Sequence, residues 1–339
     1  MSTTVSRLRR CVLRAAPALL AAGLALPGAA QQTTAPVKVR YEEVVRSVLY
    51  VPMYVAMSQG YFKEAGLDLS MKTSQGTDKG MAALLTGSAD IVLIGPEASI
   101  YVANSESPVK PRIFAGLTAT DGFLLMSRKP IAQFDWNMLK GTTVMAFRPG
   151  SNPDVFLETA LRKKGLDPKK DLKLVNNIGP AARAGAWAAG QADFAIFLEP
   201  EATALEKAGQ AHAVASVGRE VGPVDYTVFT ATDAFLKKNP GVAQTWTNVI
   251  VRAQKHVASA PAADLAKQIA EFFPGMGQAE LVAAIERYRG IGLWKTNPTV
   301  EKAAMEQLQN MLVASGLLES AKRVPYEQLV ASEFAAKAK

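Results

Sequence analysis

The sequence predicts an α/β fold built as two lobes, because of two features of its pattern. Runs typical of β-strands alternate with helical runs from Val37 onward, and the same alternation restarts near residue 142. Strands separated by helices are typical of βαβ units, which build a largely parallel sheet. Each series is too short to account for the whole chain, so we expect two sheets, each covered by its own helices.

The first series begins with a strand at residue 37 and continues to residue 129. Gly66 suits the position beyond a helix end, and Pro96 suits the first position of a helix. The expected strands are 37–43, 67–73, 90–95, 112–118 and 122–129, and the expected helices are 52–64, 79–86 and 96–104.

The second series contains a helix with clear start and stop signals. Asn152 is a good N-cap, Pro153 suits the first helical position, and Gly165 suits the cap beyond the last turn. The expected strands are 142–147, 172–177, 193–199 and 211–217, and the expected helices are 153–164, 181–189 and 200–208. The run over 224–232 follows this series, and the composition changes after it. The remaining chain is almost wholly helical, over 240–259, 261–272, 278–287, 299–315 and a tail from Pro325.

The first 30 residues have the pattern of a cleaved export signal. Four arginines precede an apolar run over residues 15–26, which is too short to span a bilayer as a helix. Small residues at Gly28 and Ala30 then predict cleavage after Ala30 and an exported, periplasmic protein. Arg9 and Arg10 also resemble a twin-arginine signal, so general secretion and twin-arginine export both remain open.

The charge and cysteine content exclude several classes of function. The first 30 residues hold four of the 38 basic residues and none of the 30 acidic ones, so the rest of the chain carries a net charge of only +4. Such a balance is not typical of a nucleic-acid binder. The single cysteine, Cys11, lies in the signal, which excludes disulfides and thiolate chemistry from the mature chain. His212 and His256 are far apart, so we expect no metal and no cofactor.

No catalytic motif supports an enzyme. The sequence contains no Walker loop, no G-x-G-x-x-G, no G-x-S-x-G and no H-E-x-x-H. Glu42 and Glu43 are neighbours on a strand, so they point to opposite faces and cannot act as a carboxylate pair.

Polar and aromatic side chains follow the carboxyl ends of four predicted strands. In open α/β sheets, ligands bind outside those ends. The sequence therefore predicts one ligand site built from both lobes. Its predicted members are Ser47, Tyr50, Tyr54, Glu97, Ser99, Arg148, Ser151, Asn152, Glu199 and Tyr226.

The segment "RPGSN" is the predicted contribution of the second series. Gly150 allows the backbone to approach a ligand, and Ser151 and Asn152 offer hydrogen bonds from side chain or backbone. Arg148 and the helix start favour an anionic group such as a sulfonate or carboxylate. The carboxylate of Asp154 lies in the first turn, so it already takes up part of the favourable positive potential at the helix start. The alternatives are that the turn is only a cap and that Arg148 pairs with a surface acid.

Aromatic and acidic members of the site favour a ring-containing ligand. Tyr50, Tyr54 and Tyr226 are suited to stack on a planar ring, and Glu97 and Glu199 are suited to accept hydrogen bonds from its amino or N–H groups. The alternative is that the tyrosines only pack and that both glutamates are solvated.

Four segments carry a resemblance to a known family. They are "VPMYVAMSQGYFKEAGLDLSMKT", "LLTGSADIVLIGPEAS", "LKGTTVMAFRPGSNPDVFLETALRKKGLDP" and "GQADFAIFLEPEATALEKAG". They resemble bacterial ABC-transporter solute-binding proteins of the group that serves sulfonates, nitrate, taurine and thiamine-precursor pyrimidines. The similarity covers about residues 37–257.

The resemblance implies a type II periplasmic-binding-protein fold with two crossover strands and a ligand in the cleft between the lobes. Lobe one would comprise residues 31–120 and 223–339, with the helical C-terminal part packed on it, and lobe two would comprise residues 121–222. The implied function is the binding component of an ABC importer, a monomer that delivers a small organic ligand to an inner-membrane permease and its ATPase.

Two other functions stay open beside transport. A related branch of proteins makes a pyrimidine by consuming its own histidine, with iron and a cysteine-rich motif. This sequence has Tyr50 in the region of that histidine and no mature cysteine, so an enzyme is not expected. The third function is a ligand-sensing module, which would require a separate membrane receptor because the chain carries no signalling domain.

Overall fold

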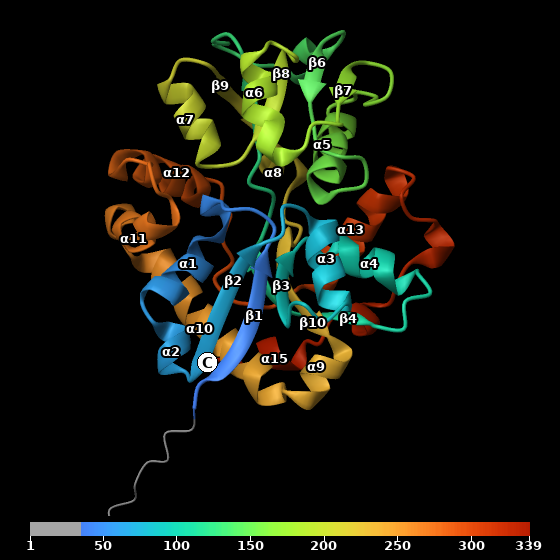
Figure 1. Ribbon diagram of the computed structural model, residues 1–339. Helices are drawn as coiled ribbons and strands as arrows, with labels where there is room; N and C mark the ends of the chain where they lie inside the picture. The colour runs from blue at the N-terminus through green and yellow to red at the C-terminus, as the bar shows by residue number, and fades with distance from the viewer. Residues whose placement is uncertain (1–34) are drawn as a thin grey trace, which may run out of the picture. The chain divides into compact units, whose positions relative to one another are not determined.

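The computed structural model describes residues 35–339. The predicted export signal and its cleavage point after Ala30 lie outside the described residues. The described part contains two five-stranded sheets, which Figure 1 shows in blue to gold and in green to yellow. Within residues 35–339, no helix combines the length and the apolar character of a membrane-crossing segment.

The first sheet has the strand order β2-β1-β3-β10-β4. Its strands are β1 (Val37–Glu43), β2 (Leu67–Thr73), β3 (Ile91–Ile94), β4 (Pro111–Thr118) and β10 (Thr227–Thr232). β1 runs parallel to β2 and β3, whereas β10 runs antiparallel to both of its neighbours, β3 and β4. Every residue of β3 is buried, as expected for a strand with helices on both faces.

The second sheet repeats this arrangement, with the order β7-β6-β8-β5-β9. Its strands are β5 (Leu124–Ser127), β6 (Thr143–Met145), β7 (Lys173–Val175), β8 (Phe194–Phe197) and β9 (His212–Ser216). β6 runs parallel to β7 and β8, and β5 runs antiparallel to β8 and β9. The chain thus leaves the first sheet before β5 and returns to it at β10. The predicted two-lobed α/β fold with two crossover strands is confirmed.

Helices connect the strands within each series. The first series contains η1 (Val48–Tyr50), α1 (Val51–Ser58), α2 (Tyr61–Glu64), α3 (Thr77–Leu85) and α4 (Glu97–Ala103). The second contains η2 (Trp136–Leu139), α5 (Asn152–Lys163), η3 (Pro180–Ala182), α6 (Arg183–Ala188), α7 (Glu201–Lys207) and α8 (Val217–Val221). The helix predicted over 52–64 is divided at Gly60, whose φ of 73° is left-handed. A residue in this conformation ends a helix, and glycine adopts it at little cost.

The C-terminal part is helical, as the sequence predicts. It contains α9 (Asp233–Lys238), α10 (Pro240–Ser259), α11 (Ala262–Ile269), η4 (Ala270–Phe272), α12 (Gln278–Gly290), α13 (Lys302–Ala314), η5 (Ser320–Lys322), α14 (Tyr326–Leu329) and α15 (Glu333–Ala336). Trp246 of α10 packs against Tyr41 of β1 and Phe229 of β10, with ring centroids 5.4 and 5.5 Å apart. These contacts hold α10 against the first sheet, and Figure 1 shows α10 beside the strands of that sheet.

The start of α5 differs from the prediction by one residue. The helix begins at Asn152, and Ser151 is its N-cap with an extended backbone, so the predicted cap at Asn152 is wrong. The reason is that the Asn152 side chain is used elsewhere: its amide donates to the backbone oxygen of Tyr226 at 2.9 Å. Ser151 Oγ donates back to the oxygen of Arg148, so neither side chain caps the helix. The predicted glycine beyond the other end is confirmed, with a φ of 78° at Gly165.

Gly218 provides a test of how closely α8 approaches the crossover before β5. A Cβ at Gly218 would lie 2.1 Å from the backbone oxygen of Asp121, closer than real contacts allow. Gly218→Ala therefore forces the crossover backbone to move, and we expect the free energy of unfolding to fall by about 1–3 kcal/mol. Urea unfolding followed by circular dichroism measures this change.

Gly185 is the matched control. It lies inside α6, and nothing lies within 4 Å of an added Cβ. Because alanine favours helices, Gly185→Ala should raise the free energy of unfolding by up to about 1 kcal/mol. If both variants unfolded at the same urea concentration, the tight packing of α8 on the crossover would be contradicted.

Candidate functional site

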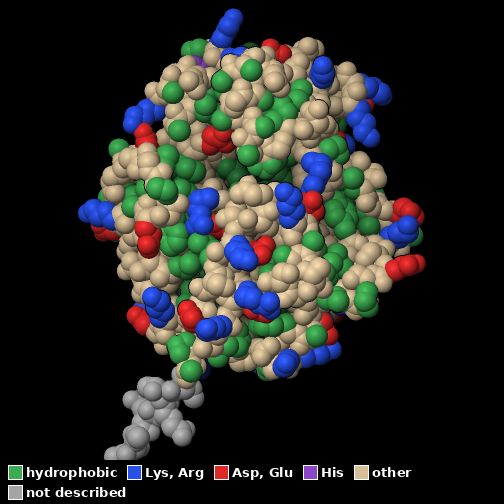
Figure 2. Space-filling model, viewed as in Figure 1, with side chains coloured by type: hydrophobic (Ala, Val, Ile, Leu, Met, Phe, Trp, Pro, Cys, Tyr) green, Lys and Arg blue, Asp and Glu red, His purple; other side chains and the backbone are tan. Residues whose placement is uncertain are grey.

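A cavity of about 610 Å³ lies between the two sheets. The segments that follow β1, β2, β6, β7 and β8 line it, so it lies at the carboxyl ends of the parallel strands of both sheets. Figure 2 shows hydrophobic side chains inside this hollow and basic ones at its rim. A cavity of this volume is in the range that encloses small organic ligands.

The predicted site residues divide into two groups. Seven of the ten line the cavity, namely Ser47, Tyr50, Arg148, Ser151, Asn152, Glu199 and Tyr226. The other three, Tyr54, Glu97 and Ser99, are buried and do not line it. Tyr54 Oη donates to the carboxylate of Glu43 at 2.8 Å, so its hydroxyl is already used inside the protein.

Glu97 lies against the start of α5. Its Oε1 accepts a hydrogen bond from the backbone N–H of Asn152 at 3.3 Å. The side chain is buried, and burial raises the pKa of its carboxyl to about 7. Close by, the carboxyl of Asp154 accepts from the N–H of Gly150 at 3.0 Å. The donors at the turn before α5 are therefore partly occupied by the protein's own carboxyl groups.

The arginines of the cavity are also engaged by protein groups. Arg148 pairs with Asp78 at 2.8 Å, which is the surface-acid alternative that the sequence left open. Arg46 pairs with Glu43 at 3.2 Å, and its guanidinium lies 5.2 Å from the centroid of Tyr54.

Arg183 is the third arginine and is buried. Its guanidinium donates to the backbone oxygens of Ala146, Met145 and Ile196, at the ends of β6 and β8. It also lies 3.9 Å from the ring centroid of Phe147. Burial lowers the pKa of Arg183 to about 10. This side chain holds two strand ends and one aromatic wall of the cavity in place.

Glu199 joins the two series of elements through three groups. Its backbone oxygen accepts from Ser47 Oγ at 2.6 Å and from the N–H of Val48 at 3.2 Å. Its backbone N–H donates to the hydroxyl of Tyr288 at 2.7 Å. Its carboxylate accepts from Arg287 at 2.8 Å.

The carboxylate of Glu199 therefore faces α12 and the first turn of α7. Thr203 donates to it from both its N–H and its hydroxyl, and burial raises its pKa. Glu97 and Glu199 are 1% and 0% exposed, so the alternative that both glutamates are solvated is wrong.

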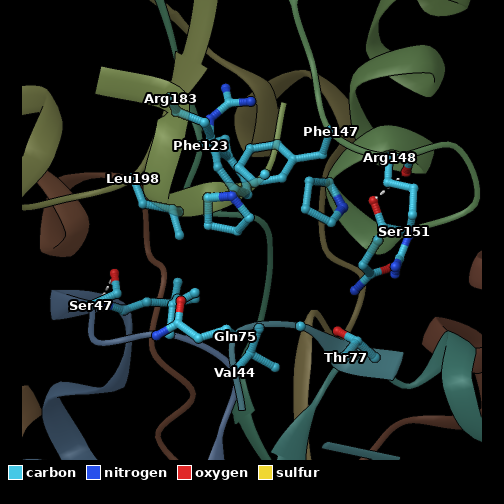
Figure 3. A pocket seen from close by; sticks show the side chains of 18 of the residues that line it. Val44, Ser47, Gln75, Thr77, Phe123, Phe147, Arg148, Ser151, Arg183 and Leu198 are labelled. Carbon is cyan, nitrogen blue, oxygen red and sulfur yellow. Dashed lines mark hydrogen bonds between the residues drawn. The ribbon is translucent and has the colours of Figure 1, made fainter. Parts of the chain in front are cut away.

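Several residues of the cavity were missed by the sequence prediction. The rings of Phe123 and Phe147 form an aromatic wall, with centroids 4.9 Å apart. Gln75 and Asn176 also line the cavity. Figure 3 shows Gln75 across the cavity from the two phenylalanines. Asn176 follows β7 and Gln75 follows β2, so their places at strand ends could have indicated both residues.

Within residues 35–339, no group of three or more histidine, cysteine or acidic side chains is arranged to hold a metal ion. Two α/β sheets that exchange one strand each around a cavity define a periplasmic-binding-protein fold. The chain belongs to the NMT1/THI5 like family, whose model matches residues 49–264. The family resemblance predicted from the sequence is confirmed.

Proteins similar to this chain include several whose names describe them as binding proteins. Binding protein YtlA of Bacillus subtilis (strain 168) is 40% identical over 301 residues, which cover 88% of this chain and 89% of that protein. The alkanesulfonate-binding protein SsuA of Xanthomonas axonopodis pv. citri, solved with MOPS, has a TM-score of 0.72 at 17% identity and covers 88% of this chain and 100% of that one. The nitrate-binding protein NrtA of Synechocystis PCC 6803 has a TM-score of 0.72 at 13% identity, covering 88% and 87%. The two structures show a shared fold.

Glu97→Gln tests the ionisation of this buried carboxyl. The folded pKa of about 7 lies above the ordinary value of 4.5, so the folded state binds the proton more tightly than the unfolded state. The stability of the natural protein should therefore fall as pH rises from about 5 to 7. The neutral side chain of Glu97→Gln does not titrate, so the variant does not lose stability in this way. Its free energy of unfolding, relative to that of the natural protein, should rise by about 2–3 kcal/mol between pH 5 and pH 8.

Asp78→Asn is the control for this pH series. Arg148 lowers the pKa of Asp78 below its ordinary value, so the contribution of this carboxylate is lost only as pH falls through that lowered pKa. The stability difference between Asp78→Asn and the natural protein should stay constant from pH 5 to pH 8. Urea unfolding at each pH measures both variants, and a constant difference for Glu97→Gln as well would contradict its raised pKa.

Proposed function

We propose that this protein is the exported solute-binding component of an ABC importer. It captures a small organic ligand in the cavity between its lobes and delivers it to a membrane permease. The observation that carries the proposal is the cavity of about 610 Å³, which the carboxyl ends of both sheets line together. A sulfonate-binding and a nitrate-binding protein share the fold, and a relative at 40% identity is named as a binding protein.

The proposed lobes follow the two sheets. Residues 31–120 and 223–339 form lobe one, and residues 121–222 form lobe two. Closure is a hinge motion of the segments before β5 and before β10, because these connect the two sheets. In the described conformation, Glu199 of lobe two bonds to Ser47, Tyr288 and Arg287 of lobe one. These bonds form only when the lobes approach, so they favour the closed state.

The proposal places the mature protein in the periplasm as a monomer, after removal of residues 1–30. Its partner is an inner-membrane permease with its ATPase. The ligand classes proposed from the sequence are sulfonates, carboxylates and pyrimidine-like rings. Catalysis is not part of the proposal, because the carboxyl groups of Glu97 and Glu199 are bonded within the protein and the structural relatives named above are a sulfonate-binding and a nitrate-binding protein. A sensor role would replace the permease by a membrane receptor.

Ligand binding should stabilise the protein against heat. A ligand at 100 times its Kd adds about 2.7 kcal/mol to the free energy of unfolding, which corresponds to an upward shift in Tm of about 4 °C for a chain of this size. A melting screen of sulfonates, pyrimidines, nitrate and aromatic acids measures this shift, and calorimetry of each hit should give one ligand per chain. Steady conversion of a hit to a product, followed by mass spectrometry, would support an enzyme instead.

Arg287→Met tests whether the ion pairs of Arg287 with Glu199 and Glu206 hold the lobes together. The change leaves the buried carboxylate without its cation, so we expect the free energy of unfolding to fall by about 1–3 kcal/mol. Small-angle X-ray scattering should show a larger radius of gyration, because an open cleft returns Glu199 to water. Arg289→Met is the control on the same helix, since among the described residues Arg289 bonds to Val257 and Ala260 of lobe one and to Glu286 beside it. Equal scattering from both variants would contradict this role.

A further inference from the structure

Three carboxamides are among the polar groups that remain open in the cavity, beside the charged side chains of Lys79 and Glu201. Gln75, Asn176 and Asn177 line it, and within residues 35–339 no hydrogen bond joins their side chains to other protein groups. Each carboxamide offers two N–H donors and one oxygen acceptor without a net charge. They are therefore suited to the edge of an uncharged ligand that carries both donors and acceptors.

Gln75 has an unusual backbone for a residue with a side chain. Its φ of 62° is left-handed, and it is the only non-glycine residue with a positive φ in the described part of the chain. This conformation costs on the order of 1 kcal/mol. The N–H of Gln75 donates to the backbone oxygen of Val44 at 2.9 Å, which holds the turn in place. A glycine would adopt the turn without strain, so Gln75 is a position where the backbone conformation costs energy and the side chain lies at the cavity.

Several groups suited to an anion are already used by the protein, whereas Lys79 at the rim and the Nε–H of Arg183 have no protein partner within residues 35–339. Glu97 and Asp154 accept from the N–H groups at the start of α5. Arg148 pairs with Asp78, and Arg183 bonds to strand carbonyls. A sulfonate or nitrate in the cavity would have to displace one of these partners or rely on the exposed rim.

The aromatic wall and the volume of the cavity indicate the shape and size of its ligand. Phe123 and Phe147 present aromatic surface on one side of the cavity, with Leu198 beside them (Figure 3). The cavity volume of about 610 Å³ is in the range that encloses drug-sized ligands. A nitrate ion or a short sulfonate would leave most of it to water.

We propose that the ligand is an uncharged planar compound with fused rings, held by Phe123 and Phe147 and read along its edge by Gln75 and Asn176. This inference rests on the proposed binding function and narrows its ligand class. It removes sulfonates, carboxylates and nitrate from the set of natural ligands.

Two matched compound sets test the ligand class on the mature protein. One set contains uncharged fused-ring heterocycles such as quinazolin-4-one, and the other contains anions such as naphthalene-2-sulfonate, ethanesulfonate, aromatic acids and nitrate. We expect melting shifts and calorimetric binding from the first set, at least tenfold tighter than for any anion. Tighter binding by the anions would overturn this inference and leave the binding function standing. An absence of hits in both sets would overturn the binding function itself.

Two substitutions of Gln75 test the carboxamide with the tightest uncharged binder of the screen. Gln75→Gly keeps the left-handed turn and removes the side chain, so the protein should melt no lower while its affinity falls about tenfold. Gln75→Asn keeps a carboxamide on a residue that tolerates this turn, and it should retain more affinity than the glycine variant. Unchanged affinity in Gln75→Gly would show that Gln75 does not read the ligand and would overturn the proposal.

Discussion

The exchange of one strand between the two sheets is the constraint on which the rest of the structure depends. β10 enters the first sheet antiparallel to β3 and β4, and β5 enters the second antiparallel to β8 and β9. Because the chain crosses twice, the carboxyl ends of the parallel strands of both sheets line the same cavity. The contact between Gly218 and the crossover at Asp121 follows from this double passage, as do the bonds around Glu199.

Several charged groups around the cavity are paired within the protein, although Lys79 and Glu201, which also line it, form no ion pair within the described residues. Buried carboxyl groups take the backbone donors at α5 and the guanidinium of Arg287, and strand carbonyls take the guanidinium of Arg183. Burying a charge without a partner is costly, whereas hydrogen-bonded charges are tolerated. The cavity also offers a ligand aromatic surface from Phe123 and Phe147 and neutral amides from Gln75 and Asn176. The buried carboxyl groups thus form bonds between the two lobes and leave fewer charged groups free to contact a ligand.

Much of the site follows from a simple rule about strand ends. Segments after the strands near residues 43, 147 and 198 were predicted to meet, and Ser47, Arg148 and Glu199 do line one cavity. The rule locates a residue but not the direction of its side chain. Asn152 turns toward Tyr226 rather than capping α5, and the roles of the predicted residues in binding remain predictions.

The sequence by itself determined the order of strands and helices, the two series and the helical C-terminal part, because hydrophobic periodicity and cap residues are local signals. It also determined the absence of cysteine chemistry after Cys11. Only the tertiary structure decided that Glu97 meets the start of α5 and that Glu199 meets Arg287, which lie 55 and 88 positions apart. Such pairings depend on which strand ends face each other, and local sequence preferences cannot predict this long-range arrangement.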